Sequence, residues 1–141
     1  MARMNQTELS NKNQLIEYFE QGGKPYDQWG IGTEHEKFLY RKDDLQRLGH
    51  DTKPGIEQIL KCMQESGWSP VIEKNKTIGL KKNGASISLE PGGQFELSGK
   101  NFRTIHETYR ETRHHFEDLS NICKELDVIT LALGYDPMRT R

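Results

Sequence analysis

The sequence of 141 residues has no long apolar run. No stretch approaches the roughly 20 consecutive apolar residues that a transmembrane helix needs. The N-terminus leads into polar residues without the apolar core of a secretory signal peptide. From these two absences we expect a cytoplasmic protein that does not associate with a membrane.

The sequence also lacks an excess of either charge and is poor in cysteine. Twenty Lys and Arg residues oppose 21 Asp and Glu residues, and the basic residues are scattered rather than clustered, so we expect no nucleic-acid partner. Cys62 and Cys123 lie far apart and have no zinc-ligand spacing. Both fall within helix-like apolar patterns, which predicts buried free thiols.

Patterned apolar residues predict an α+β fold. A period of three to four residues predicts helices at 10–21, 54–66 and 102–126. Extended or alternating segments predict strands at 29–40, 71–73, 77–81, 85–90, 94–98 and 128–133. This order indicates a largely antiparallel or mixed sheet with flanking helices. Because no repeat or linker interrupts the pattern, we expect residues 1–141 to form a single domain.

Several side chains carry specific expectations. Trp29 and Trp68 flank strand starts and are expected in the core. His114 and His115 cannot share one helix face, and surface positions are the simpler interpretation for both. The first predicted helix should begin at Ser10 as its cap. Its apolar face consists of Leu15, Ile16 and Phe19.

Two glutamates stand two positions apart in the first predicted strand. Side chains at positions i and i+2 of a strand leave the same face, roughly 6.5–7 Å apart along the chain. Glu34 and Glu36 should therefore point together, and His35 should point away. Two carboxylates so arranged repel each other unless a cation lies nearby.

A second acidic segment surrounds the turn Pro91-Gly92-Gly93. On one face the alternation places apolar residues expected in the core, namely Leu89, Phe95 and Leu97. On the opposite face it places Glu90, Gln94, Glu96 and Ser98. The turn can change the alternation, so the pattern leaves open whether Glu90 and Glu96 share a face.

If these strands are neighbours, four carboxylates line one surface: Glu34, Glu36, Glu90 and Glu96. Hard oxygen ligands in this number suit Mg²⁺, which usually shares its coordination with substrate phosphates. The alternative is a solvated sheet face with lysines as its charge partners. The candidates for that role are Lys37, Lys81 and Lys82.

Residues 32–38 and 88–99 resemble signature stretches of the plant and proteobacterial type of glutamate–cysteine ligase. They read Gly-Thr-Glu-His-Glu-Lys-Phe and Ser-Leu-Glu-Pro-Gly-Gly-Gln-Phe-Glu-Leu-Ser-Gly. Residues 78–81, 84–87 and 133–137 are similar too. The resemblance extends from about residue 10 to the end of the chain.

The resemblance implies a function for the whole family member. Members join the γ-carboxylate of glutamate to the amine of cysteine through a γ-glutamyl phosphate, using ATP and Mg²⁺, in the first step toward glutathione. Their fold is similar to that of glutamine synthetase, and this chain would be the N-terminal part of the catalytic domain. The four glutamates would hold magnesium or substrate, Gln94 and Ser98 would contact substrate, and no side-chain nucleophile is needed.

Two other interpretations remain open. The chain could be a truncated, non-catalytic remnant that associates with itself or a partner through exposed sheet edges. It could also be a small Mg²⁺-binding module without ligase activity.

Overall fold

The structure, a computed structural model, describes residues 8–138 and consists of three α-helices and one six-stranded sheet. The helices are α1 (Lys12–Gln21), α2 (Ile56–Glu65) and α3 (Ile105–Glu125), and a short 3₁₀ helix, η1, covers Tyr26–Gln28. The strands are β1 (Glu34–Arg41), β2 (Ser69–Glu73), β3 (Lys76–Lys82), β4 (Ala85–Glu90), β5 (Gln94–Ser98) and β6 (Val128–Leu131). No helix in this part of the chain is both long and apolar enough to cross a membrane.

The strands form an open antiparallel sheet in the order β2-β3-β4-β5-β1-β6. Neighbours from β2 to β5 are joined by short turns, and Asn83 and Gly84 adopt the positive φ angles expected of a two-residue hairpin. β1 is different, because it lies between β5 and β6, two strands far from it in the sequence. The α+β class is therefore confirmed, and the likeness to glutamine synthetase stays a prediction.

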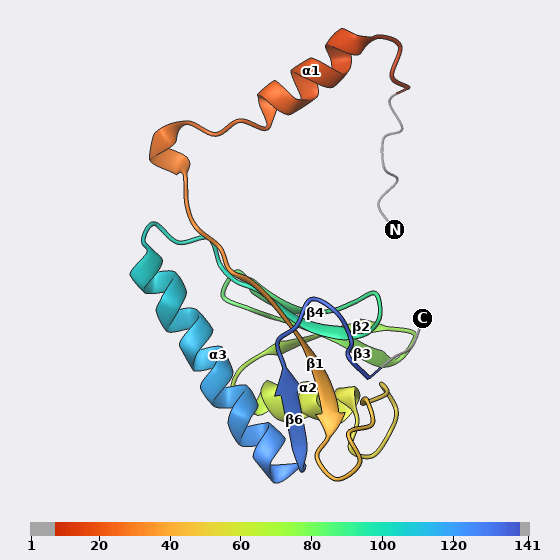
Figure 1. Cartoon of the computed structure of the whole chain (residues 1–141). Helices are drawn as coiled ribbons and strands as arrows, with labels where there is room; N and C mark the ends of the chain where they lie inside the picture. The colour runs from red at the N-terminus through yellow and green to blue at the C-terminus, as the bar shows by residue number, and fades with distance from the viewer. Residues whose placement is uncertain (1–7, 139–141) are drawn as a thin grey trace.

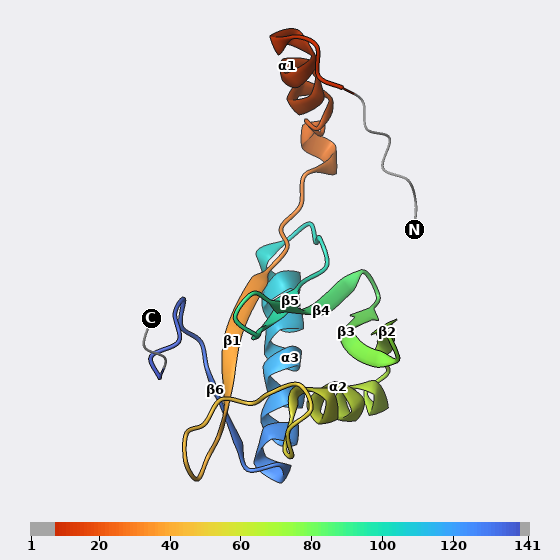
Figure 2. The same ribbon diagram turned by 90° about the vertical axis from the view of Figure 1, so that its right-hand side faces the viewer.

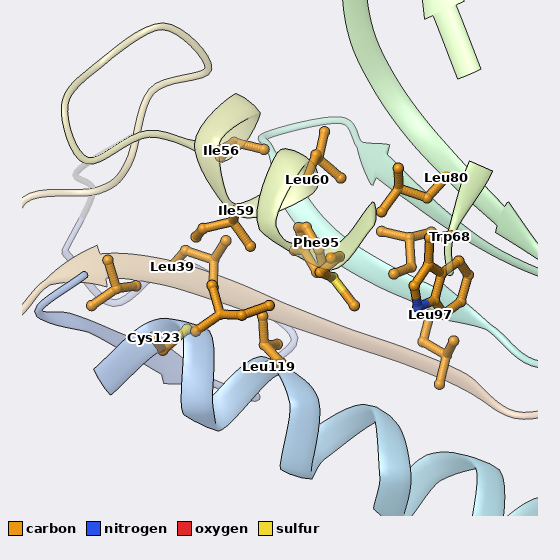
Figure 3. Packing of buried hydrophobic residues seen from close by; sticks show 14 of the residues in the cluster. Leu39, Ile56, Ile59, Leu60, Trp68, Leu80, Phe95, Leu97, Leu119 and Cys123 are labelled. Carbon is orange, nitrogen blue, oxygen red and sulfur yellow. The ribbon is translucent and has the colours of Figure 1, made fainter. Parts of the chain in front are cut away.

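The hydrophobic core lies between the sheet and the helices α2 and α3 (Figure 3). From α2, the buried side chains are those of Ile56, Ile59, Leu60 and Met63. They pack with residues of the sheet and α3, including Leu39, Leu80, Phe95, Leu97 and Leu119. Cys123 is buried in this cluster and Cys62 is half-buried, and both are free thiols. On the opposite side of the sheet, which we call the open face, none of the helices in residues 8–138 packs (Figure 1).

The first helix forms close to the predicted range, but its apolar face is not covered by the rest of the chain that the structure describes. α1 and η1 stand away from the sheet, joined to β1 by an extended segment (Figures 1 and 2). None of the α1 residues is buried, and Phe19 is 75% exposed. The cap is Asn11, not Ser10. An apolar stripe predicts amphipathicity, but it cannot supply the surface against which the stripe would pack.

The prediction that Trp29 lies in the core is also wrong. Its side chain is 60% exposed, and its indole N–H donates to the carbonyl of Lys24. The predicted strand at 29–40 begins only at Glu34, because the preceding segment makes a single isolated bridge, Ile31 with Phe102. Trp68, in contrast, is buried as expected.

Candidate functional site

Strands β1, β4 and β5 carry the predicted acidic residues side by side. The register places Glu36 beside Glu96 and Glu96 beside Ser88. One step along, Glu34 lies beside Ser98, and Glu90 pairs with Gln94 at the turn end of the hairpin. These six positions are Glu34, Glu36, Glu90, Gln94, Glu96 and Ser98, and we call them the acidic face.

The alternation of side chains along β1 and β5 separates the acidic face from the helices. Phe95 and Leu97, which alternate with Glu96, are fully buried in the core on the helix side. His35 also points to that side, where its ring contacts Phe116 of α3 edge-on at 4.6 Å between centroids. The prediction that His35 points away from Glu34 and Glu36 is therefore confirmed.

Polar side chains connect the strands within the acidic face. The Gln94 amide donates to the carboxylate of Glu36 at 2.7 Å. The Ser98 hydroxyl donates to Glu96 at 2.8 Å. Gln94 and Ser98 thus hold two of the carboxylates, and their expected contact with substrate stays a prediction.

The pKa of Glu90 reflects how close the carboxylates lie to one another. This pKa is raised, first by a hydrogen bond with the Glu96 carboxyl, then by loss of water, and further by the negative charges of Glu96 and Glu36. A raised pKa means that the site resists a third negative charge. Glu90, Glu96 and Glu36 therefore form one electrostatic group, and the turn does not separate the two hairpin glutamates.

The acidic face supplies the donor chemistry that Mg²⁺ prefers, because its ligands are carboxylate, amide and hydroxyl oxygens. In the described structure, however, no three of the four glutamates have their oxygens within 4.8 Å of one another. Glu34 and Glu36 are exposed, so their side chains can rotate toward an ion. Glu96 is only 8% exposed. The residue types fit a magnesium ion, and its binding here stays a prediction.

Lysines do not neutralise the acidic face. Within residues 8–138, no salt bridge joins any of the four glutamates to a basic side chain. Lys37 is fully buried on the helix side, and Lys82 donates to the carbonyl of Ser66. The contacts of Lys37 and Lys82 therefore do not support the alternative, in which lysines balance the charge of a solvated face.

His115 contradicts the prediction of a surface position. It is 4% exposed, and its Nε2 lies 3.0 Å from Nζ of Lys37. Burial lowers the pKa of His115 to about 3, with further contributions from Lys37 and His35. Helical spacing showed only that His114 and His115 diverge, and the closeness of β1 decided which of them is buried.

A second ligand-like group was missed by sequence reasoning. His50, Asp51 and Glu57 bring one nitrogen and two carboxylate oxygens within 4.8 Å of one another. Asp51 already accepts from Lys76 and contacts His50, while Lys61 pairs with Glu57. With both carboxylates paired to lysines, this group is better explained as an ion-pair network.

Comparison with known proteins identifies relatives. The model of the glutamate-cysteine ligase family 2 matches residues 30–141. Glutamate–cysteine ligase A, chloroplastic, of Oryza sativa subsp. japonica is 41% identical over 132 residues, which are 93% of this chain and 26% of that protein. The chloroplastic glutamate–cysteine ligases of Medicago truncatula and Arabidopsis thaliana are each 39% identical over 132 residues, 93% of this chain and 25% of each relative.

These relatives correct one prediction and set the scale of the chain. Their names place them in chloroplasts, so the expected cytoplasmic location is contradicted. That expectation rested on the absence of a secretory signal and a membrane span, and neither absence distinguishes the cytoplasm from a plastid. The chain spans about a quarter of the length of the relatives it matches. With its signature segments adjacent in one sheet and a family match over most of its length, this chain belongs to the glutamate–cysteine ligase family.

Proposed function

We propose that the chain supplies the metal-binding face of an ATP-dependent ligase that joins glutamate to cysteine. Family membership and the names of the relatives, which are glutamate–cysteine ligases, support this reaction. The observation that carries the proposal is the group formed by Glu36, Glu90 and Glu96, in which proximity raises the pKa of Glu90. A bound cation would offset the mutual repulsion of these three carboxylates.

The reaction would proceed in two steps. An oxygen of the glutamate γ-carboxylate attacks the γ-phosphorus of ATP, the bond to the β-phosphate oxygen breaks, and ADP leaves. The cysteine nitrogen then attacks the γ-carbonyl carbon, loses a proton, and phosphate leaves. Neither step requires a nucleophile from the protein.

The acidic face would act by binding and orientation. Mg²⁺ would supply electrostatic stabilisation of the charge that develops on the transferred phosphoryl group. Glu34, Glu36, Glu90 and Glu96 would hold the ion. Gln94 and Ser98, now bonded to Glu36 and Glu96, would turn toward substrate oxygens.

Binding of Mn²⁺, a paramagnetic substitute for Mg²⁺, tests the proposal directly. The chain should bind Mn²⁺ saturably, as followed by electron paramagnetic resonance of the free ion. Glu96→Gln and Glu36→Gln should each weaken this binding by about tenfold or more, since even outer-shell partners of a metal contribute that much.

The matched control is Glu73→Gln, a glutamate on the edge strand β2 away from the acidic face. Its Mn²⁺ affinity should equal that of the unmodified chain. Equal losses in all three variants would point to non-specific attraction by negative charge, and no loss in Glu96→Gln would refute the metal site.

A further inference from the structure

Arg47 is a basic side chain held against the open face of the sheet. It lies in the segment between β1 and α2, and a backbone bridge pairs it with Tyr40. Its guanidinium carbon lies 4.9 Å from the centroid of the Phe38 ring. On the open face, Phe38 directly follows Glu36 along β1. The cation therefore lies one side chain along the strand from the acidic face.

The far end of the chain holds Arg47 in this place. Nη1 of Arg47 contacts Oδ2 of Asp136 at 3.1 Å, and the Tyr40 hydroxyl donates to Oδ1 of the same carboxylate at 2.7 Å. The side chains of Arg47 and Asp136 are only 18% and 10% exposed. An ion pair so shielded from water keeps the guanidinium in one orientation more firmly than a fully exposed pair would.

The same guanidinium lies against the turn that joins β4 to β5. A Cβ atom at Gly93 would lie 2.8 Å from Nη2 of Arg47, so only a glycine permits this approach. Gly93 is followed by Gln94, whose amide donates to Glu36. Arg47 thus contacts the turn that carries the hairpin side of the acidic face.

Part of the guanidinium has no hydrogen-bond partner among the residues that the structure describes. Within residues 8–138, Nη1 donates to Asp136, whereas Nε and Nη2 donate no hydrogen bond. Nε and one N–H of Nη2 form a planar fork that matches two oxygens of a carboxylate or phosphate. A site with four carboxylates repels anionic substrates, and a cation at its rim offsets that repulsion.

We propose that Arg47 binds an oxyanion of the substrate at the rim of the acidic face. This inference rests on the proposed ligase function, whose substrates offer two such groups, the carboxylates of glutamate and the phosphates of ATP. Asp136 orients the guanidinium, and the remaining N–H groups face the ligand. Arg47 is thus a substrate-binding residue that the family-like signature segments do not contain.

Ligand titrations of the full chain test this assignment. L-glutamate and Mg²⁺–ATP are titrated separately and followed by calorimetry, for the unmodified chain, Arg47→Gln and Arg47→Lys. Arg47→Gln should weaken binding of at least one ligand by about tenfold or more, as expected for loss of a charge-assisted hydrogen bond. Arg47→Lys retains the charge but loses the fork, so its affinity should fall between the two.

Asp136→Asn and Arg113→Gln complete the set of variants. Asp136→Asn removes the carboxylate charge that orients the guanidinium but keeps the guanidinium itself, so its affinity should fall by less than that of Arg47→Gln. Arg113 is an exposed arginine on α3 paired with Glu117, and its loss should change nothing. Melting temperatures show whether each variant is folded, and Arg47→Lys serves alone if Arg47→Gln unfolds.

The outcomes separate the two ligands and the two proposals. A loss confined to glutamate assigns the fork to a carboxylate, and a loss confined to Mg²⁺–ATP assigns it to a phosphate. Three results would overturn the inference. They are unchanged affinity in both Arg47 variants, a loss in Asp136→Asn as large as that in Arg47→Gln, and no saturable binding of either ligand to the unmodified chain. Mn²⁺ affinity, measured in parallel, reports on the glutamates and should not fall in Arg47→Gln.

Discussion

Lys37 and His115 form a buried pair directly beneath the acidic face, with Nζ of Lys37 3.0 Å from Nε2 of His115. Nζ also donates to the carbonyl of His35 at 3.1 Å. The ammonium lies 5.8 Å and 5.6 Å from the centroids of Phe95 and Phe116. It therefore has hydrogen-bond acceptors and aromatic faces around it, but no carboxylate within salt-bridge distance in the described structure.

This environment predicts that stability increases with pH on the alkaline side. Burial lowers the pKa of Lys37 from 10.5 to about 8, against smaller opposing contributions from Cys123 and Glu96. Between these two pH values the unfolded chain binds more protons than the folded chain, so deprotonation favours folding. Relative to Lys37→Met, the free energy of unfolding should rise by about 2 kcal/mol between pH 8 and pH 10. Urea unfolding at a series of pH values measures this difference.

Lys37→Met is the appropriate reference because other groups titrate in the same range. Tyr40, for example, has its pKa raised to about 12, chiefly by burial, which destabilises the folded chain as pH rises above 10. Such groups are common to both chains, and their effects cancel in the difference. Parallel curves for the two chains would mean that Lys37 is not buried as a cation.

The acidic face should limit the stability of the chain without metal. The pKa of Glu90 is raised in the folded state, so the stabilisation from its protonated form is present at acidic pH and is lost as pH rises through that value. Removing one negative charge should remove this cost. At pH 7 without divalent cations, Glu90→Gln should melt at or above the temperature of the unmodified chain.

Added Mg²⁺ should reverse that order. Added metal should raise the melting temperature of the unmodified chain and have a smaller effect on Glu90→Gln, because a ligand that binds only the folded state stabilises it more the more tightly it binds. Glu73→Gln, on the edge strand β2, is the control and should behave like the unmodified chain in both conditions. A Glu90→Gln chain that is less stable without metal and equally stabilised by Mg²⁺ would contradict the metal site.

The glycines of the β4–β5 turn should differ in how they tolerate a side chain. Gly93 has a φ of +75°, and its Cβ would meet Nη2 of Arg47 at 2.8 Å, so Gly93→Ala should cost about 1–2 kcal/mol and displace Arg47. Gly92 has a φ of +86°, yet its Cβ would lie 3.9 Å from the same atom. Gly92→Ala should therefore lose stability but retain the position of Arg47. Thermal unfolding measures the loss of stability in each variant.

Gly134→Ala is the control for this pair of glycines. No atom lies within 4 Å of a Cβ at Gly134, and its φ is not in the left-handed region. Its stability should stay within about 0.5 kcal/mol of the unmodified chain. If Gly93→Ala were equally harmless, the close approach of Arg47 to the turn would be wrong.

Self-association through sheet edges stays a prediction that the structure makes specific. β2 and β6 are the edge strands of the described sheet, and Ile129 and Leu131 on β6 are 36% and 37% exposed. Ile129→Lys should weaken any dimer by about tenfold or more, because a charged side chain protects an edge from pairing. Sedimentation velocity at a series of concentrations measures this. Ile105→Lys, on α3 and away from both edges, should have no effect, and an unmodified chain that stays monomeric throughout would end the proposal.

The sequence by itself determined the elements and the faces of its strands. Alternation in β1 and β5 separated Glu36 and Glu96 from the core, and the turn residues Asn83 and Gly84 marked a hairpin. These rules are local, because the period of side chains along a strand and the φ preferences of turn residues depend only on the nearest residues. The family signature lies in the same segments, which is why the candidate site could be predicted.

Only the tertiary structure decided which segments meet. Strand β1 lies between β5 and β6, and this placement brings Glu36 beside Glu96 and buries Lys37 against His115. Arg47 meets Asp136 although 89 positions separate them in the chain. Contacts of this kind depend on how the whole core excludes water at once, and no local pattern of residues encodes that outcome.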